Sequence, residues 1–172
     1  MRATTCMLSR LLALTLLALT LVTVGCMGAA YRAGDQAYYG DGDRAEALAL
    51  YQAGAAEGDA GSLYSLGVMS ATGDGLPQNE ALALEYYRQA AELGSPEAQT
   101  ALGLRYLYGV GVPRDVDRGT ELVRAAFAQG SPAAALELSY MYREGLGVPQ
   151  NERMAQYMLW AARAGGMPAK AE

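Results

Sequence analysis

The side chains that catalyse reactions in water are scarce in this chain of 172 residues. It has no histidine, and so no imidazole that could act as a general base near neutral pH or as a metal ligand. Its one lysine is Lys170, and Met167 stands where a Ser-x-x-Lys nucleophile requires serine. These missing groups argue against an enzyme, and we expect no cofactor and no metal site.

Two kinds of short stretch look like ligand-binding loops but lack essential parts. The Gly-x-Gly turns at 73–75, 109–111 and 145–147 lack the third glycine of a dinucleotide loop, and each is followed by a proline. The acidic stretch GDGD at 40–43 lacks the twelve-residue spread of oxygen ligands and the closing glutamate of an EF-hand. Both stretches favour turns between helices.

The charge balance limits the class of partner. The chain carries 13 Lys+Arg against 18 Asp+Glu, a formal net charge of −5. Nucleic-acid binding needs a basic face, so we expect no nucleic-acid partner. The length predicts one compact domain.

The N-terminus has the pattern of a secretory signal. Arginines lie at positions 2 and 10, and residues 11–25 carry no charge. The segment ends in TVGC, which resembles the lipobox of bacterial lipoproteins, with Gly25 as the small residue before Cys26; Thr23 departs from the usual leucine. The resemblance implies that residues 1–25 are a signal peptide and that Cys26 carries lipid.

Cleavage there would leave residues 26–28 as a lipid-anchored N-terminus close to the membrane. It would also remove two arginines and no acid, so the remaining chain would be two charges more acidic than −5. Met27 is not the aspartate that commonly holds lipoproteins at the inner membrane, so the resemblance implies the outer membrane, facing the periplasm. An ordinary cleaved signal on a secreted or periplasmic protein, and an uncleaved anchor, remain as alternatives.

A 36-residue repeat organises the rest of the chain. Shifting the sequence by 36 aligns glycines at 73, 109 and 145 and prolines at 77, 113 and 149. The residue pattern of each unit predicts two helices. In the unit at 95–130, Ser95 and Asp115 are the expected N-caps of the first and second helix, and Gly109 is the expected end of the first. We place repeats at 59–94, 95–130 and 131–166, a shorter unit at 29–58, and a C-terminal tail at 167–172.

The repeat resembles the Sel1-like repeat, a relative of the tetratricopeptide repeat. The segment ALGLRYLYGVGVPRDVDRGTELVRAAFAQGSPAAA carries its Leu-Gly pair at 102–103, its tyrosine at 106 and its Gly-x-Gly-Val turn. Paired aromatics at 86–87 and paired alanines at 90–91 also match. Residues 29–58 look more like a plain tetratricopeptide unit, with Asp35 where the helical glycine should be.

The resemblance implies an all-α, right-handed α-solenoid of about four helical hairpins, whose first helices line a concave face. Such a surface binds a protein or peptide. The residues that we expect on it are Arg32, Gln36, Tyr39, Tyr64, Val68, Thr100, Leu104, Leu107, Leu136, Tyr140 and Arg143.

The last repeat differs from the others on one helix face. Met154, Tyr157 and Trp160 are spaced to share that face, and the earlier repeats have mostly polar or charged residues there. We interpret these three as a terminal contact face for a partner or for self-association. The alternative is that residues 167–172 fold back and cover it.

The favoured function is a non-enzymatic scaffold or adaptor, anchored in the periplasm, that binds a protein or peptide. An alternative that the resemblance implies is an immunity lipoprotein that neutralises a secreted toxic effector, for which an acidic surface suits a basic target. A hydrolase of the β-lactamase-like kind is a remote alternative, because those relatives carry paired cysteines that this chain lacks.

Overall fold

The computed structural model describes residues 28–165, which contain helices and no strand. The predicted all-α solenoid is confirmed. The signal peptide at 1–25, Cys26 and the tail at 167–172 lie outside the described residues. The helices are α2 (Ala29–Asp35), the π-helical segment η1 (Gln36–Asp41), α3 (Arg44–Ala56), α4 (Ala60–Thr72), α5 (Glu80–Glu92), α6 (Pro96–Tyr108), α7 (Val116–Ala128), α8 (Pro132–Glu144) and α9 (Glu152–Arg163).

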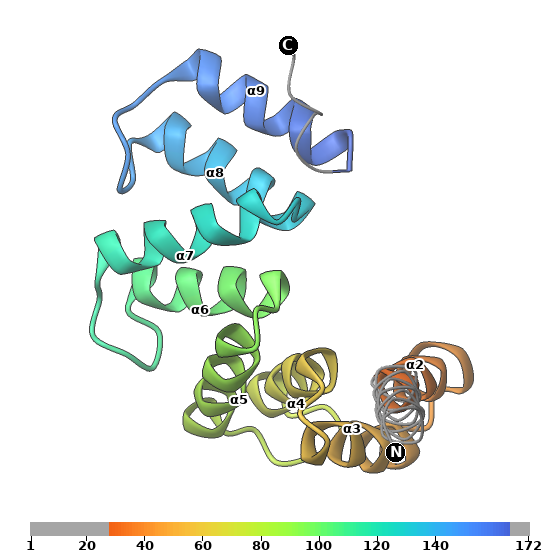
Figure 1. The fold of residues 1–172 in the computed structure, drawn as a ribbon. Coiled ribbons are helices and arrows are strands. Elements are labelled where there is room, and N and C mark those ends of the chain that lie inside the picture. Colours follow the sequence, from red (N-terminus) through yellow and green to blue (C-terminus); the bar gives the residue numbers. More distant parts are fainter. Residues whose placement is uncertain (1–27, 166–172) are drawn as a thin grey trace, which may run out of the picture.

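The helices pair into four hairpins that stack in chain order. α2 packs on α3, α4 on α5, α6 on α7 and α8 on α9, and each hairpin contacts the next. Together they form a curved column, with α2 at one end and α9 at the other (Figure 1). Among the described helices, the first helix α2 also contacts the first helix α4, and α6 contacts α8. The second helices of neighbouring hairpins make fewer contacts with each other than these two pairs do. The inner elements of a curved stack lie closer together, so the contacts of α2 with α4 and of α6 with α8 favour the first helices as the inner side of the curve; α4 and α6 do not make a comparable contact.

The helix boundaries follow the predicted caps. The Oγ of Ser95 accepts a hydrogen bond from the Ala98 N–H at 3.1 Å, and Asp115 Oδ1 accepts from the Arg118 N–H at 3.0 Å. Gly109 ends α6 in the left-handed conformation with φ 72°, which a residue with a side chain rarely adopts. These contacts are local, which explains why the sequence predicted them.

The hairpins share a core that continues from one repeat to the next. One buried cluster joins Leu107 and Val123 of the third repeat to Leu138 and Met141 of the fourth. Each repeat thus covers apolar surface that its neighbour cannot bury alone, as expected for a solenoid. Within residues 28–165, no helix combines the length and apolar character needed to cross a membrane.

The first repeat departs from the predicted alignment. Gly34, not position 35, is the buried glycine of α2: an added Cβ would lie 2.5 Å from Cε1 of Tyr51. Gly67 faces Tyr87 in the same way in the second repeat. The expectation that Asp35 replaces the helical glycine was therefore wrong by one residue. The shift leaves the side chain of Asp35 beside a pocket.

Candidate functional site

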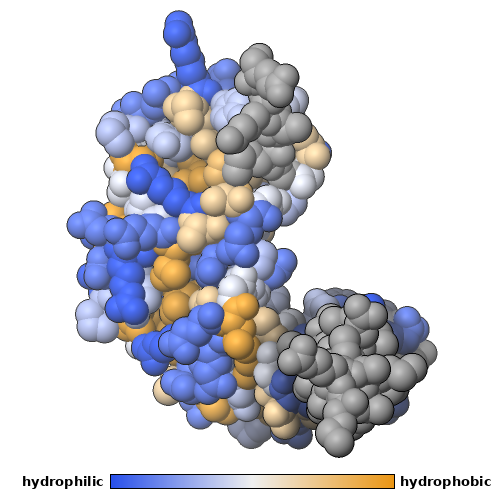
Figure 2. All heavy atoms as spheres, in the orientation of Figure 1, coloured by the Kyte–Doolittle hydropathy of each residue, from blue (hydrophilic) through white to orange (hydrophobic). Residues whose placement is uncertain are grey.

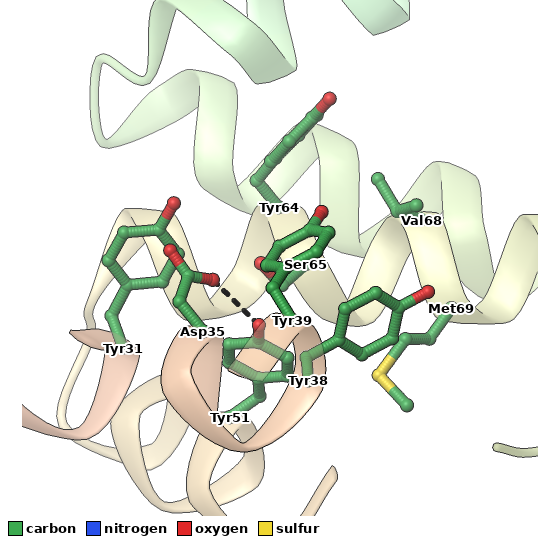
Figure 3. Close-up of a pocket in the computed structure, with 9 residues that line it drawn as sticks. All are labelled: Tyr31, Asp35, Tyr38, Tyr39, Tyr51, Tyr64, Ser65, Val68 and Met69. Atoms are coloured by element: carbon green, nitrogen blue, oxygen red, sulfur yellow. Dashed lines mark hydrogen bonds between the residues drawn. The ribbon is translucent and has the colours of Figure 1, made fainter. Parts of the chain in front are cut away.

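A pocket rich in tyrosine lies between the first two repeats. Its volume is ≈ 130 Å³. The rings and one carboxylate converge on it from α2, η1, α3 and α4 (Figure 3). We call it the tyrosine pocket; its lining residues are Tyr31, Asp35, Tyr38, Tyr39, Tyr51, Tyr64, Ser65, Val68 and Met69.

Asp35 organises one wall of the tyrosine pocket. The hydroxyl of the buried Tyr51 donates a 2.7 Å hydrogen bond to Asp35 Oδ1 (Figure 3). The rings of Tyr31 and Tyr51 lie 6.2 Å apart between centroids. Burial, followed by the nearby Asp35 carboxylate, raises the pKa of Tyr31 to about 12. Burial also raises the pKa of Tyr51, so both phenols stay protonated at neutral pH and can donate hydrogen bonds.

Tyr38 and Tyr39 form the wall supplied by η1. Their rings meet edge to face, with centroids 4.7 Å apart. The Tyr38 hydroxyl donates to Asp74 in the turn after α4, and Arg44 Nε pairs with Asp74 Oδ2 at 3.0 Å. The Arg44 guanidinium also lies 3.7 Å from the centroid of the Tyr38 ring. These contacts hold Tyr38 in place, while Tyr39 is 80% exposed and available to a partner.

The next repeat interface contains a similar arrangement of tyrosine, carboxylate and arginine. Arg105 lies 4.4 Å from the ring centroid of Tyr87, and its Nε pairs with Glu80 Oε1 at 2.7 Å. The Arg105 guanidinium thus occupies the face of the Tyr87 ring. The arrangement links α6 to α5.

A second hollow, of ≈ 270 Å³, lies on the last hairpin. The Arg143 guanidinium stands 5.5 Å from the Tyr140 ring centroid. Burial raises the pKa of the Glu137 carboxyl. We call this hollow the α8 groove; its lining residues are Leu136, Glu137, Ser139, Tyr140, Arg143 and Leu159.

The residues expected on the concave face divide into four groups. Tyr39, Tyr64 and Val68 line the tyrosine pocket, and the residues that line the α8 groove are Leu136, Tyr140 and Arg143. Arg32 and Gln36 are exposed but line neither hollow. The middle group is Thr100, Leu104 and Leu107.

Two residues of this middle group, Thr100 and Leu107, are buried, although we expected them on the exposed concave face. Leu107 is 0% exposed and packs in the core cluster with Leu138, while the buried Thr100 donates its hydroxyl to the carbonyl of Pro96 at 2.8 Å. Leu104 is half-buried against the same cluster. These side chains face the following repeat, so a partner cannot reach Thr100 or Leu107. Leu136, in the column of Thr100, is 52% exposed because no described helix follows α9 to cover it.

The terminal contact face is smaller than expected. Tyr157 and Trp160 are 41% and 53% exposed, and their rings lie 6.0 Å apart. Met154 is half-buried and packs against the core, so it does not belong to this exposed face. The equivalent positions of the second repeat hold an exposed ion pair, with Arg88 Nη1 3.8 Å from Glu85 Oε2.

Sequence reasoning missed the rest of the tyrosine pocket. Tyr31, Asp35, Tyr38 and Tyr51 line it but were not among the candidate residues. A compositional signal was present, because five of the 12 tyrosines fall between positions 31 and 64. The repeat pattern did not reveal it: Tyr51 has the counterpart Tyr87 in the second repeat, but Tyr38 and Tyr39 have no aromatic counterparts at the 36-residue spacing.

The surface also shows where apolar residues gather. Figure 2 shows a broken apolar strip along the curved column, bordered by hydrophilic residues. The large exposed apolar side chains on first helices or the π-helical segment include Tyr39, Tyr108, Leu136 and Tyr140. Tyrosine and leucine at partial exposure are suited to contact with another protein, since aromatic side chains commonly anchor such interfaces.

The family comparison assigns all four hairpins. The model for the Sel1 repeat matches residues 27–59, 60–95, 96–131 and 132–165. It thus includes residues 27–59, where the pattern alone had favoured a plain tetratricopeptide unit. No curated protein matches the chain.

Two solved structures have the same fold. One is c5321, a protective antigen present in uropathogenic Escherichia coli strains that displays an SLR fold; it is 30% identical, with a TM-score of 0.67 over 84% of this chain and 31% of that chain. The other is a Sel1 repeat protein from Oxalobacter formigenes, 31% identical, with a TM-score of 0.60 over 73% of this chain and 36% of that chain. The chain spans about a third of the length of each.

Four matched repeats cover most of the chain, and the solved structures agree with them in fold. The chain belongs to the Sel1 repeat family, whose fold is typically a non-catalytic scaffold that binds protein partners.

Proposed function

We propose that this protein is a lipid-anchored scaffold of the bacterial envelope that holds a protein or peptide partner on the inner side of its curved column. The observation that carries the proposal is the set of exposed aromatic and aliphatic side chains on first helices, from Tyr39 at one end to Leu136 and Tyr140 at the other. Two hollows lie beside these residues, the tyrosine pocket and the α8 groove. A partner that spans both would contact every repeat.

The envelope location rests on the N-terminal pattern. The uncharged stretch at 11–25 and the small residue before Cys26 support a cleaved signal with lipid on that cysteine. The first described helix begins at Ala29, so few residues would separate the lipid from the first repeat. At ~3.3–3.6 Å per extended residue, the column would start next to the membrane. Met27 favours the outer membrane on its periplasmic side.

The binding test replaces tyrosines on the first and on the second helix of the last hairpin, whose side chains are almost equally exposed. Tyr140 and Tyr157 are 40% and 41% exposed, but Tyr140 lies on the first helix of its hairpin and Tyr157 on the second. The tagged full chain is cross-linked in cells, and the bound proteins are compared with those of a Tyr39→Ala/Tyr140→Ala variant and a Tyr157→Ala variant. We expect the double variant to lose a partner that Tyr157→Ala retains. Equal capture by all three chains would contradict the proposal.

The acidic charge of the chain supports a second candidate, an immunity lipoprotein that neutralises a basic secreted effector. A gene for a secreted lipase beside the gene for this chain would favour it. The direct test is co-expression: the chain should restore growth to cells that express that lipase in the periplasm. Continued killing would remove this candidate and leave the scaffold proposal intact.

A further inference from the structure

The described part of the fold repeatedly pairs arginine with tyrosine and a carboxylate. Guanidinium carbons lie 3.7 Å from the ring centroid of Tyr38 and 4.4 Å from that of Tyr87. The same two arginines pair with Asp74 and Glu80, at 3.0 and 2.7 Å. A planar cation over a tyrosine face with a carboxylate at its edge is a favourable arrangement for guanidinium, which stacks on rings and pairs with carboxylates.

The tyrosine pocket contains the same components in a concave form. Tyr31, Tyr51 and Tyr64 supply rings, and Asp35 supplies the carboxylate. Tyr51 donates to Asp35 Oδ1, and the other carboxylate oxygen points away from Tyr51 (Figure 3). A hydrogen bond with Asp35 also contributes to the raised pKa of Tyr31. A carboxylate has about four lone-pair sites, so Asp35 can accept a further donor beside these two phenols. None of the nine lining residues is an arginine or a lysine. Arg44 lies over the ring of Tyr38, whereas a cation stacked on Tyr31 or Tyr64 would come from another molecule.

The electrostatics of the pocket favour a cation. Burial raises the pKa of the Tyr64 phenol, and the charge of Glu97 raises it further, while the more weakly acting charge of Arg105 lowers it. The charges of Asp35 and Glu97 also raise the pKa of Tyr31. Negative charge from two carboxylates thus reaches the rings, whose faces already attract cations.

The size of the pocket limits the ligand. A cavity of ~150 Å³ accommodates benzene. At ≈ 130 Å³, the tyrosine pocket has room for a planar side-chain head group of a few atoms. Whole nucleotides and sugars are larger than this space. The head group of an amino-acid side chain fits it.

We propose that the tyrosine pocket binds the guanidinium group of an arginine side chain presented by the protein partner. The inference rests on the proposed scaffold function and names the chemistry that its partner brings. The guanidinium stacks on the rings of Tyr31 and Tyr64, and one of its N–H groups donates to Asp35. Exposed Tyr39 contacts the partner beside that arginine.

The test measures peptide binding to the full chain in detergent by isothermal titration calorimetry. The probe is acetyl-Gly-Arg-Gly-amide, and its matched control has citrulline, which keeps the planar shape but loses the charge. We expect the arginine peptide to bind about tenfold more tightly than the citrulline peptide. We expect a lysine peptide to bind more weakly than the arginine peptide, since ammonium is not planar.

Two variants test whether the arginine peptide binds in the tyrosine pocket. Asp35→Asn keeps an acceptor for the Tyr51 hydroxyl and removes the charge, so the arginine peptide should lose about tenfold in affinity. Asp117→Asn makes the same change on the exposed face of α7, far along the chain, and should bind as the unaltered chain does. Circular dichroism melting establishes that both variants fold. The comparison of arginine with citrulline on the unaltered chain needs neither variant.

Equal affinity for the arginine and citrulline peptides, or for the arginine and lysine peptides, overturns the inference. Retention of full affinity by a folded Asp35→Asn also overturns it. These outcomes do not touch the scaffold proposal, which fails only if capture is insensitive to Tyr39 and Tyr140. A partner captured through those tyrosines by a chain that does not bind the arginine peptide would uphold the scaffold and refute the arginine pocket.

Discussion

The ring of Tyr87 lies directly on the backbone of Gly67. A Cβ added to Gly67 would come within 2.7 Å of Cε1 of that ring, and Tyr87 is only 3% exposed. The close approach of α4 and α5 depends on this contact. Position 67 therefore has no room for a side chain unless the buried tyrosine moves.

The Gly67→Ala variant should be less stable. We expect a loss of about 2 kcal/mol in the free energy of unfolding, because overpacking against a buried ring outweighs the better helix propensity of alanine. Urea denaturation measures it. The matched control is Ser139→Ala in the same column of the fourth repeat, where a side chain is already present, and it should change stability by less than about 0.5 kcal/mol. A Gly67→Ala variant as stable as this control would contradict the assigned packing.

The Arg105–Glu80 ion pair should stabilise the interface between the second and third repeats. Its side chains are 16% and 33% exposed, so it is less screened than a surface pair. A double-mutant cycle with Arg105→Met and Glu80→Gln should give a coupling of about 1 kcal/mol. The same cycle on Arg143 and Glu144, which are 56% and 51% exposed, should give almost none. Equal coupling energies at the two pairs would rule out the structural role of Arg105.

The buried tyrosines should make the fold sensitive to alkali. Burial raises the pKa of both Tyr31 and Tyr87 to about 12 from an ordinary value of 10.0; Asp35 adds to the shift for Tyr31. Between these values the unfolded chain has lost phenolic protons that the folded chain retains. The free energy of unfolding should therefore be constant up to about pH 10 and fall as the pH rises toward 12.

Denaturation at a series of pH values, with tyrosinate absorbance followed in parallel, checks this dependence. Replacing Tyr87 with phenylalanine removes one of the shifted groups, so its stability should decline less steeply over the same range. A decline with the same slope in both chains would show that Tyr87 is not responsible.

The aromatic pair on α9 allows a test of self-association. Tyr157→Glu and Trp160→Arg together recreate the charges that the second repeat has at Glu85 and Arg88. Both side chains are substantially exposed, so the double variant should keep its stability within about 0.5 kcal/mol. If this face joins two copies, analytical ultracentrifugation of the unaltered chain should show a dimer that the variant abolishes. A monomer in both cases would exclude self-association through α9.

Lipid attachment at Cys26 has its own prediction. Cells grown with a labelled fatty acid should incorporate the label into the full chain, and Cys26→Ser should abolish both the label and sedimentation with membranes. Cys6→Ser, at the only other cysteine, is the control and should retain both. Membrane association that survives Cys26→Ser without label would instead indicate an uncleaved anchor.

The sequence by itself determined the repeat, its helical hairpins and most of their boundaries. The Ser95 and Asp115 caps, the Gly109 helix end and the Gly-x-Gly turns act within a few residues of the chain, so their spacing was sufficient to predict them. The Leu-Gly pair at 102–103 was also visible in the sequence, and a Cβ added to Gly103 would lie 2.8 Å from Cγ2 of Val123.

Only the tertiary structure decided which side chains a partner can reach. Thr100 and Leu136 occupy the same repeat position, yet the first is 5% and the second 52% exposed, because exposure depends on whether another hairpin follows. The tyrosine pocket joins Asp35 to Tyr51 and Tyr64 from three separate helices, after a one-residue shift in the first repeat. Periodicity describes each helix along its own axis, and it contains no information on where the ends of different helices meet.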